Sequence, residues 1–446
     1  MKRFLILLLA CFVVLPMATS AFAGGPPPKD ILKGVFIEAN PASHTAVFQK
    51  DGSGDTLTLV IPESIPFDKV KLNRKMLVGL DKHAEVPNTV KDISIMFMTM
   101  TTTKVIALIV IGLIGGLLSG FIGSGGAFVL TPAMMSLGAP GAVAVASNMC
   151  HKFPKAMVGT YKRFKYGQVD IKLAFVMAAT AVIGVQIGIM IQKYILNHWG
   201  NAGSNLYVSV VFVFILIIVG GYVLMDAIKL TRGDTSKESG PAPFALKMQQ
   251  INLPPMIHFK VAKVRISAWI TVPVGLATGM LAATIAVGGF IGVPGMIYVI
   301  GASAVVASAT ELGIAFMMGA WGSIQWGISG LIDIRMTLLI LSASLIGVQL
   351  GALGTTYVKD HMIKLVMAAV MLIVAVSRGA KIPGYLAALN LRAPLTASNA
   401  ALLESVSFWA LIAALATAGI IISVAMFVGI TKDRAEKRAE AAISHG

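Results

Sequence analysis

Glu311 is the residue whose chemistry fits its surroundings least, because this carboxylic acid lies inside a long apolar run from 303 to 327. If the run crosses a bilayer, an ionisable group within it is costly and marks a candidate functional site. Glu311 could take up and release a proton there. It could equally be held by a lysine as a structural charge, and the sequence leaves both interpretations open.

A second group of polar residues lies in another apolar run. Ser147 and Asn148 carry a hydroxyl and an amide that could donate hydrogen bonds to an oxyanion or bond a neighbouring helix. Lys152 follows Asn148 by one helical turn and could neutralise an anion, whereas Lys155 is expected to extend toward the lipid headgroups. His151 is interpreted as a hydrogen-bonded core residue.

An internal duplication relates the two groups. Residues 112–194 align without a gap with residues 275–357, an offset of 163 positions, and 23 of the 83 pairs are identical. Two polar positions are among the pairs: Ser147 with Thr310, and Asn148 with Glu311. The threonine hydroxyl is therefore a candidate on the same grounds as the serine. Internal repeats are typical of secondary transporters, whose substrate sites lie between the halves.

Two pairs of glycines also coincide under this offset: Gly125 and Gly126 with Gly288 and Gly289. Each pair precedes a short apolar segment that contains a proline, which predicts a half-helix or re-entrant segment rather than a full crossing. Free backbone N–H groups and the positive end of the helix dipole could bind a buried anion there. The alternative interpretation is that these glycines only allow tight helix packing.

Gln186 pairs with Gln349, and Asp170 pairs with Asp333. The glutamines lie two residues from glycines that are expected to pack helices closely, so they point to the opposite side. They could line a pathway or bridge helices. Each aspartate precedes a long apolar run, so each is predicted to cap the N terminus of a helix.

The composition indicates a membrane protein. Hydrophobic residues make up 56% of the 446 residues and charged residues 13%, and the mean hydropathy is +0.82. So many apolar stretches cannot all lie in a soluble core. The net charge of +16 does not indicate nucleic-acid binding, because the basic residues lie in short loops between apolar runs. Such residues orient membrane helices toward the cytoplasm.

A membrane helix needs about 20 mostly apolar residues. On that length, spans are predicted at 104–123, 126–139, 142–160, 169–193, 206–229, 266–287, 289–301, 303–327, 335–357, 362–378 and 408–430. If the chain starts outside, most basic loops lie inside, with Arg378, Lys381 and Arg392 as the exceptions. An odd number of elements separates equivalent points of the repeats, which predicts inverted repeats suited to alternating access.

The first residues predict export. A basic pair, an apolar run and Ala21-Phe22-Ala23 indicate a signal peptide over residues 1–23. A lipoprotein site at Cys11 is an alternative, although the apolar run continues past it. Residues 24–98 contain short alternating runs and turn signals, which predict a small exported β domain that resembles an oligonucleotide/oligosaccharide-binding barrel.

The predicted fold is an all-α polytopic membrane protein with an inverted-repeat core containing half-helices or re-entrant segments, preceded by the small all-β domain. After residue 98 the predicted segments are repeat 1 (104–230), a cytoplasmic loop (231–265), repeat 2 (266–392), an additional helix (404–431) and a cytoplasmic tail (432–446).

The stretch Gly112-Leu-Ile-Gly-Gly-Leu-Leu-Ser-Gly-Phe-Ile-Gly-Ser-Gly-Gly126 is followed by Ala146-Ser147-Asn148 and a basic loop, and the pattern recurs more weakly at 275–311. This pattern resembles the TauE/SafE family of membrane permeases, often called sulfite exporters. The resemblance covers residues 105–390 and implies a secondary permease for sulfite, organosulfonates or related sulfur-containing or carboxylate anions. It leaves the substrate open and excludes the β domain and the last helix.

Enzymes are disfavoured, because the sequence contains no P-loop, HExxH motif, nucleophile elbow or metal-spaced cluster. No cofactor or metal is expected. An intramembrane hydrolase using Ser124 or Ser147 with the distant His151 is the weakest alternative. A membrane-anchored sensor or assembly subunit acting through its β domain is another, although polar residues inside the spans argue against a mere anchor.

The expected partners are a small anionic substrate and the lipid bilayer, with no nucleic acid. A homo-oligomer and an extracytoplasmic partner of the β domain stay open. The expected location is the inner (cytoplasmic) membrane, with the β domain outside and the C terminus in the cytoplasm.

Overall fold

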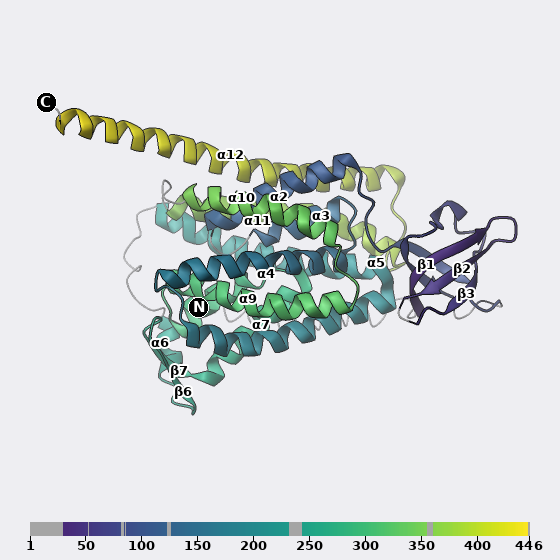
Figure 1. The fold of residues 1–446 in the computed structure, drawn as a ribbon, viewed down its shortest axis with the longest axis horizontal. Coiled ribbons are helices and arrows are strands. Elements are labelled where there is room, and N and C mark those ends of the chain that lie inside the picture. Colours follow the sequence, from purple (N-terminus) through teal and green to yellow (C-terminus); the bar gives the residue numbers. More distant parts are fainter. Residues whose placement is uncertain are drawn as a thin grey trace.

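The structure is a computed structural model, and it describes residues 30–51, 53–81, 84, 86–122, 126–231, 243–354 and 360–444. A small β domain lies at one end of an elongated helical body (Figure 1). The predicted signal peptide, Ser124 and Gly125 lie outside the described residues.

The β domain is one antiparallel sheet in the strand order β3-β2-β1-β4-β5. Its strands are β1 (Asp30–Asn40), β2 (Thr45–Lys50), β3 (Thr56–Val60), β4 (Lys75–Leu80) and β5 (Val90–Ile95), with a short helix η1 (Phe67–Lys69) before β4. A parallel bridge between Val60 and Thr89 brings β3 to the start of β5, as a partly open five-stranded barrel requires. The expected small β domain is confirmed.

The helical body contains α2 (Thr102–Ile122), α3 (Ala127–Ser136), α4 (Gly141–Lys165), α5 (Ile171–Thr231), α6 (Pro243–Gln249), α7 (Ala268–Ile285), α8 (Gly289–Gly295), the π-helix η2 (Met296–Ile300), α9 (Ala304–Ile328), α10 (Ile334–Gly354), α11 (Asp360–Ala388) and α12 (Ala397–Ser444). Among the described residues, seven helices are long and apolar enough to cross a membrane. The helix α5 contains the two spans predicted at 169–193 and 206–229. A break at Gly200, where φ is 63° and ψ is −159°, divides them.

The segments Ala127–Ser136 and Gly289–Ile300 are short apolar helices, as predicted. The helix α4 is not among the seven candidates, because its basic residues lower its apolar character. Its first half is nevertheless buried.

The helices of the two repeats pack in matching pairs, α2 with α10 and α5 with α7. In the first pair, Gly112 lies against Ile340 and Gly116 against Ser344. The residues 163 positions away repeat these contacts: Gly275 against Met177 and Gly279 against Ala181. The small residues therefore allow close backbone approach at equivalent places.

The helices α4 and α9 are themselves equivalent under the duplication, and they pack directly against each other. Along their contact, Gly322 lies against Met149, and Gly319 against Phe153. Farther along α4, Gly159 lies against a leucine that comes earlier in α9. Residue numbers rise along α4 as they fall along α9, so the two equivalent helices are antiparallel.

Three predictions of element boundaries were incomplete. The alternating runs that predicted the β domain lie at 34–38, 45–48, 56–61 and 76–80 and do not include the strand β5. A β-hairpin, β6 (Met256–Phe259) and β7 (Val264–Ser267), begins in the predicted cytoplasmic loop and ends two residues beyond it. The hairpin lies at the opposite end of the helical body from β1–β3 (Figure 1). The helix α11 continues ten residues beyond the predicted end at 378, which places Arg378 and Lys381 within the helix instead of a loop.

Candidate functional site

Two short helices, α3 and α8, begin at glycines. The N-caps are Gly126 and Gly288, and neither makes a side-chain capping hydrogen bond. The first turn of a helix leaves N–H groups without intrahelical partners. The ten residues of α3 extend about 15 Å, half of a hydrocarbon core of about 30 Å. One end of this helix can therefore lie near the middle of a bilayer.

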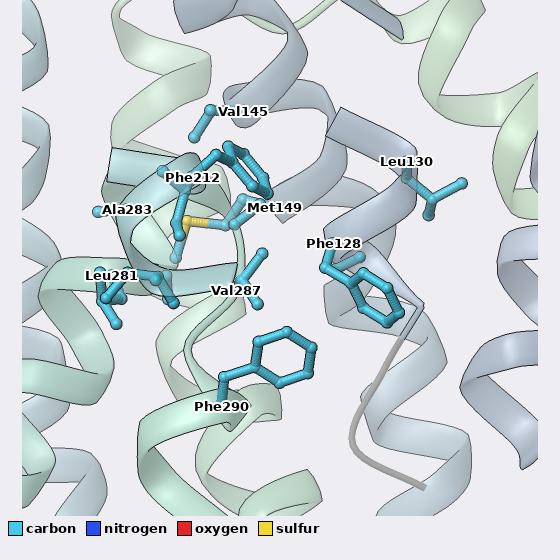
Figure 2. Close-up of a cluster of buried hydrophobic side chains, with 14 of the residues drawn as sticks. Phe128, Leu130, Val145, Met149, Phe212, Leu281, Ala283, Val287 and Phe290 are labelled. Carbon is cyan, nitrogen blue, oxygen red and sulfur yellow. The ribbon is translucent and has the colours of Figure 1, made fainter. Parts of the chain in front are cut away.

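The starts of α3 and α8 meet. Phe128 and Phe290 are each the second residue of their helix, and their ring centroids are 5.1 Å apart. Figure 2 shows the two rings next to each other between the helices, with Val287 close to them and Met149 farther away. The phenylalanine rings are buried. The positive ends of two helix dipoles thus converge on one apolar, closed place.

Asn148 fastens α3 to α4. Its Nδ2 donates to the backbone oxygen of Ala127 at 3.1 Å and to Oγ1 of Thr131 at 2.8 Å. Its Oδ1 faces Nδ1 of His151 at 3.3 Å. Asn148 is 1% exposed, and both of its N–H donors go to fixed protein groups. These bonds hold the first turn of the half-helix.

Glu311 lies at the equivalent position in the second repeat, yet it has no such bonds. The residue is 3% exposed, and both carboxyl oxygens lack a hydrogen-bond partner among the described residues. The carboxyl lies so close to Gly292 of α8 that a Cβ on Gly292 would overlap Oε2. The residue equivalent to Gly292 is Val129, so the second half has a glycine where the first half has a valine.

The basic residues of α4 face helices of both repeats, and Lys152 interacts electrostatically with Glu311 of α9. Lys155 donates to Oγ of Ser119 on α2 at 2.9 Å, so it contacts a neighbouring helix and does not simply extend to the headgroups. Nε2 of His151 lies 2.7 Å from Oγ of Ser344 on α10, as expected for a hydrogen-bonded core residue. Lys152 is partly buried, one turn beyond Asn148.

Ser147 and Thr310 join the two repeats through matching hydrogen bonds. Oγ of Ser147 accepts from the backbone N–H of Asp333 at 3.0 Å. Oγ1 of Thr310 accepts from the backbone N–H of Asp170 at 3.1 Å. Each aspartate caps its helix, since its Oδ1 accepts from the N–H three residues later. The predicted N-caps are confirmed, and both hydroxyls act as braces between α4 or α9 and the opposite repeat.

The two glutamines are not brought to the starts of α3 and α8. Oε1 of Gln186 accepts from Nε1 of Trp321 at 3.2 Å, and Gln349 is exposed on α10. Of the other candidates, Gly126, Gly288 and Gly289 lie at the helix starts, and Asn148 and Glu311 lie beside them. Within the described ranges, no group of three or more His, Cys, Asp or Glu could hold a metal ion.

Arg378 is a buried charge that the sequence interpretation placed in an outside loop. It is 0% exposed, and its Nη2 donates to Oγ of Ser136, the last residue of α3. The other short helix also ends at a donor, because Nε2 of Gln249 lies 3.0 Å from the backbone oxygen of Ile300. The sequence did not predict the burial of Arg378, because the span predicted from apolar length ends at this residue.

The described helices, the duplication and the paired short helices define a multi-pass membrane protein with an internally repeated core. The family model of the sulfite exporter TauE/SafE matches residues 108–378, more than half of the chain. The protein therefore belongs to the TauE/SafE family, whose members are membrane permeases of the anion and sulfite exporter type. Searches of curated proteins and of solved structures gave no match.

Proposed function

We propose that this protein moves a small anion, such as sulfite, an organosulfonate or a related carboxylate, across the cytoplasmic membrane by alternating access. The observation that carries the proposal is the meeting of the two half-helix starts at Phe128 and Phe290. In that place, two sets of first-turn N–H groups and two positive dipole ends can act on one negative charge.

The proposed anion site uses backbone groups at Gly125, Gly126, Gly288 and Gly289. Glycine lets a ligand approach the backbone closely, and neither N-cap has a side chain that competes for the first-turn N–H groups. Apolar walls strengthen the attraction, because charges interact more strongly where the dielectric constant is low. Lys152, one helical turn beyond Asn148, is proposed to supply a positive charge to the site.

Alternating access is the proposed mechanism, and the packing of α4 against α9 supports it. Two equivalent helices that are antiparallel and in contact are related by an axis perpendicular to their length. This is the relationship expected of inverted repeats in transporters. The touching rings of Phe128 and Phe290 leave the site closed in this conformation, and we propose that they separate when one repeat moves against the other.

Glu311 is the proposed proton-coupling residue. A charged carboxylate without a hydrogen bond in this buried place is costly, whereas a protonated carboxyl is neutral and has one O–H donor, where the Asn148 amide of the other half has two N–H donors. The acceptor equivalent to the oxygen of Ala127 is that of Phe290, and Pro294 has no N–H to occupy it. We propose that this oxygen accepts the O–H of a protonated Glu311.

Ser147, Thr310, Gln186 and Gln349 have secondary places in the proposal. The serine and threonine oxygens already accept backbone N–H groups, so we propose that each can offer only its O–H to an anion. Gln186 and Gln349 are proposed to line the pathway away from the helix starts, because Gln186 contacts Trp321 and Gln349 is exposed.

The direct test is flux into proteoliposomes with sulfite, sulfoacetate and acetate. The proposal predicts saturable uptake of at least one of these anions and competition among the ones that bind. A Phe128→Ala and Phe290→Ala double variant should leak or lose saturation, because the rings close the site. A matched control is Phe408→Ala, an exposed aromatic residue on α12. Absence of flux for every anion, with wild type correctly inserted, would overturn the permease assignment.

A further inference from the structure

A fully buried guanidinium without a counter-ion lies at the C-terminal end of α3. The proposed anion site lies at the other end of this helix. Arg378 on α11 is 0% exposed, and its Nε and Nη1 have no hydrogen-bond partner among the described residues. Its Nη2 donates to the hydroxyls of Ser136 and Ser407, at 3.5 Å for the second. All of its partners are neutral.

No carboxylate balances this charge in the described structure. The acid on the facing helix, Glu404 of α12, pairs instead with Lys381 at 2.8 Å, and its side chain is 74% exposed. The C-terminal end of α3 offers the negative end of its dipole, equivalent to about half a charge. An arginine retains its full charge in proteins. Part of the charge and two N–H donor groups therefore stay uncompensated in a place without solvent.

The neighbouring groups are those that hold oxyanions in proteins. Besides the guanidinium, the hydroxyls of Ser136, Ser377 and Ser407 lie around the junction of α3, α11 and α12. Hydroxyls can turn to donate to an anion when one is present. Guanidinium groups form strong, charge-assisted hydrogen bonds with oxyanions. The guanidinium, its burial and its unpaired N–H groups all indicate an oxyanion as the ligand.

We propose that Arg378 is the centre of a second anion site, which binds a small oxyanion such as sulfate or sulfite through Nε and Nη1. The site lies at the C-terminal end of α3, while the site of the proposed function lies at its N-terminal start. Ten residues separate the two ends, so one anion cannot occupy both. The inference does not depend on transport, because it rests on the uncompensated charge alone.

Equilibrium binding of radiolabelled sulfate to the detergent-purified protein tests the site. Arg378→Gln is expected to weaken or remove one class of bound sulfate by at least tenfold, and Arg378→Lys, which keeps the charge, should retain part of it. Lys381→Gln is the matched control, because it removes a positive charge from the same helix at a residue whose ion pair reaches the surface. Its sulfate binding should equal that of wild type.

A stability measurement covers the outcome in which Arg378→Gln fails to fold. Wild type and Arg378→Lys should melt at a higher temperature in sulfate than in an equal ionic strength of gluconate, and Lys381→Gln should show the same difference. The proposal is overturned if wild type binds no sulfate and shows no such difference, since Arg378 then only caps α3. If the wild-type protein binds sulfate at Arg378 but transports none of the tested anions, the proposed function is contradicted and the second anion site is not.

Discussion

Asn148 and Glu311 occupy equivalent positions in the two repeats, yet their surroundings differ in one respect that matters. Asn148 bonds to Ala127 and Thr131 and so fixes α3, whereas Glu311 lies against Gly292 with both oxygens unpaired. The scaffold around them is repeated, as the matching glycine contacts and hydroxyl braces demonstrate. The difference teaches that the two halves share the same packing, while only the second half has a titratable carboxyl at this position.

The largest effect is expected from making α8 resemble α3. Gly292→Val installs the residue of the first half where a Cβ would overlap Glu311, and overpacking of this kind costs about 1–3 kcal/mol. Thermal unfolding should shift to lower temperature, and transport should fall by more than tenfold because the acid is displaced. The double variant Gly292→Val with Glu311→Asn restores the shorter side chain and should recover stability. Stability that is unchanged in the single variant would contradict the contact.

The second-largest effect is expected from removing the hydrogen bonds of Asn148 in the first repeat. Asn148→Ala removes the donor to Ala127 and Thr131, and leaving buried acceptors unpaired costs about 1–3 kcal/mol. We expect a lower melting temperature and weaker anion uptake, because the first turn of α3 loosens. Asn148→Asp should be worse than Asn148→Ala, because a carboxylate cannot donate to those oxygens and also places a buried negative charge beside them. Wild-type stability in Asn148→Ala would show that the amide donor is not what holds the helix.

A smaller and symmetric effect is expected for the two hydroxyl braces. Ser147→Ala and Thr310→Val each remove one acceptor of a buried backbone N–H, a change worth about 1 kcal/mol. Both should lower stability by a similar amount in thermal unfolding. If either variant instead keeps wild-type stability and loses anion affinity, that hydroxyl contacts the substrate and the brace is secondary.

The smallest effect is expected at the matched glutamines. Gln349 is exposed on α10, so Gln349→Leu should change stability by no more than about 0.5 kcal/mol and leave flux unchanged. Gln186→Leu loses one hydrogen bond from Trp321 and should show a slightly larger loss of stability. A strong and selective loss of flux in Gln349→Leu would place the pathway along the exposed side of α10.

Much of this architecture could be predicted from the sequence because its signals are local. Apolar length gave the spans, glycines and prolines gave the short helices, and an aspartate before an apolar run gave the caps at Asp170 and Asp333. The bonds of Ser147 and Thr310 across the repeats could not be predicted, because spacing along a helix says nothing about the helix it faces. For the same reason, sequence alone could not place Glu311 against Gly292.

The ends of helices and strands were predicted incorrectly where the local composition is unusual for the element. Arg378 ended a predicted span because an arginine normally marks a loop, while the structure continues α11 to Ala388 and buries the charge. The hairpin β6–β7 contains only four residues per strand, too few for an alternating pattern to stand out.

The central claim is that the first half holds its short helix permanently while the second half holds a titratable acid at the equivalent place. Sulfite uptake into proteoliposomes, measured with and without an inward proton gradient, tests it most directly in wild type, Glu311→Gln and the control Gln349→Leu. Glu311→Gln mimics the protonated acid, so it should still exchange sulfite across the membrane but no longer respond to the gradient, while the control responds as wild type does. Full gradient dependence in Glu311→Gln would contradict the account.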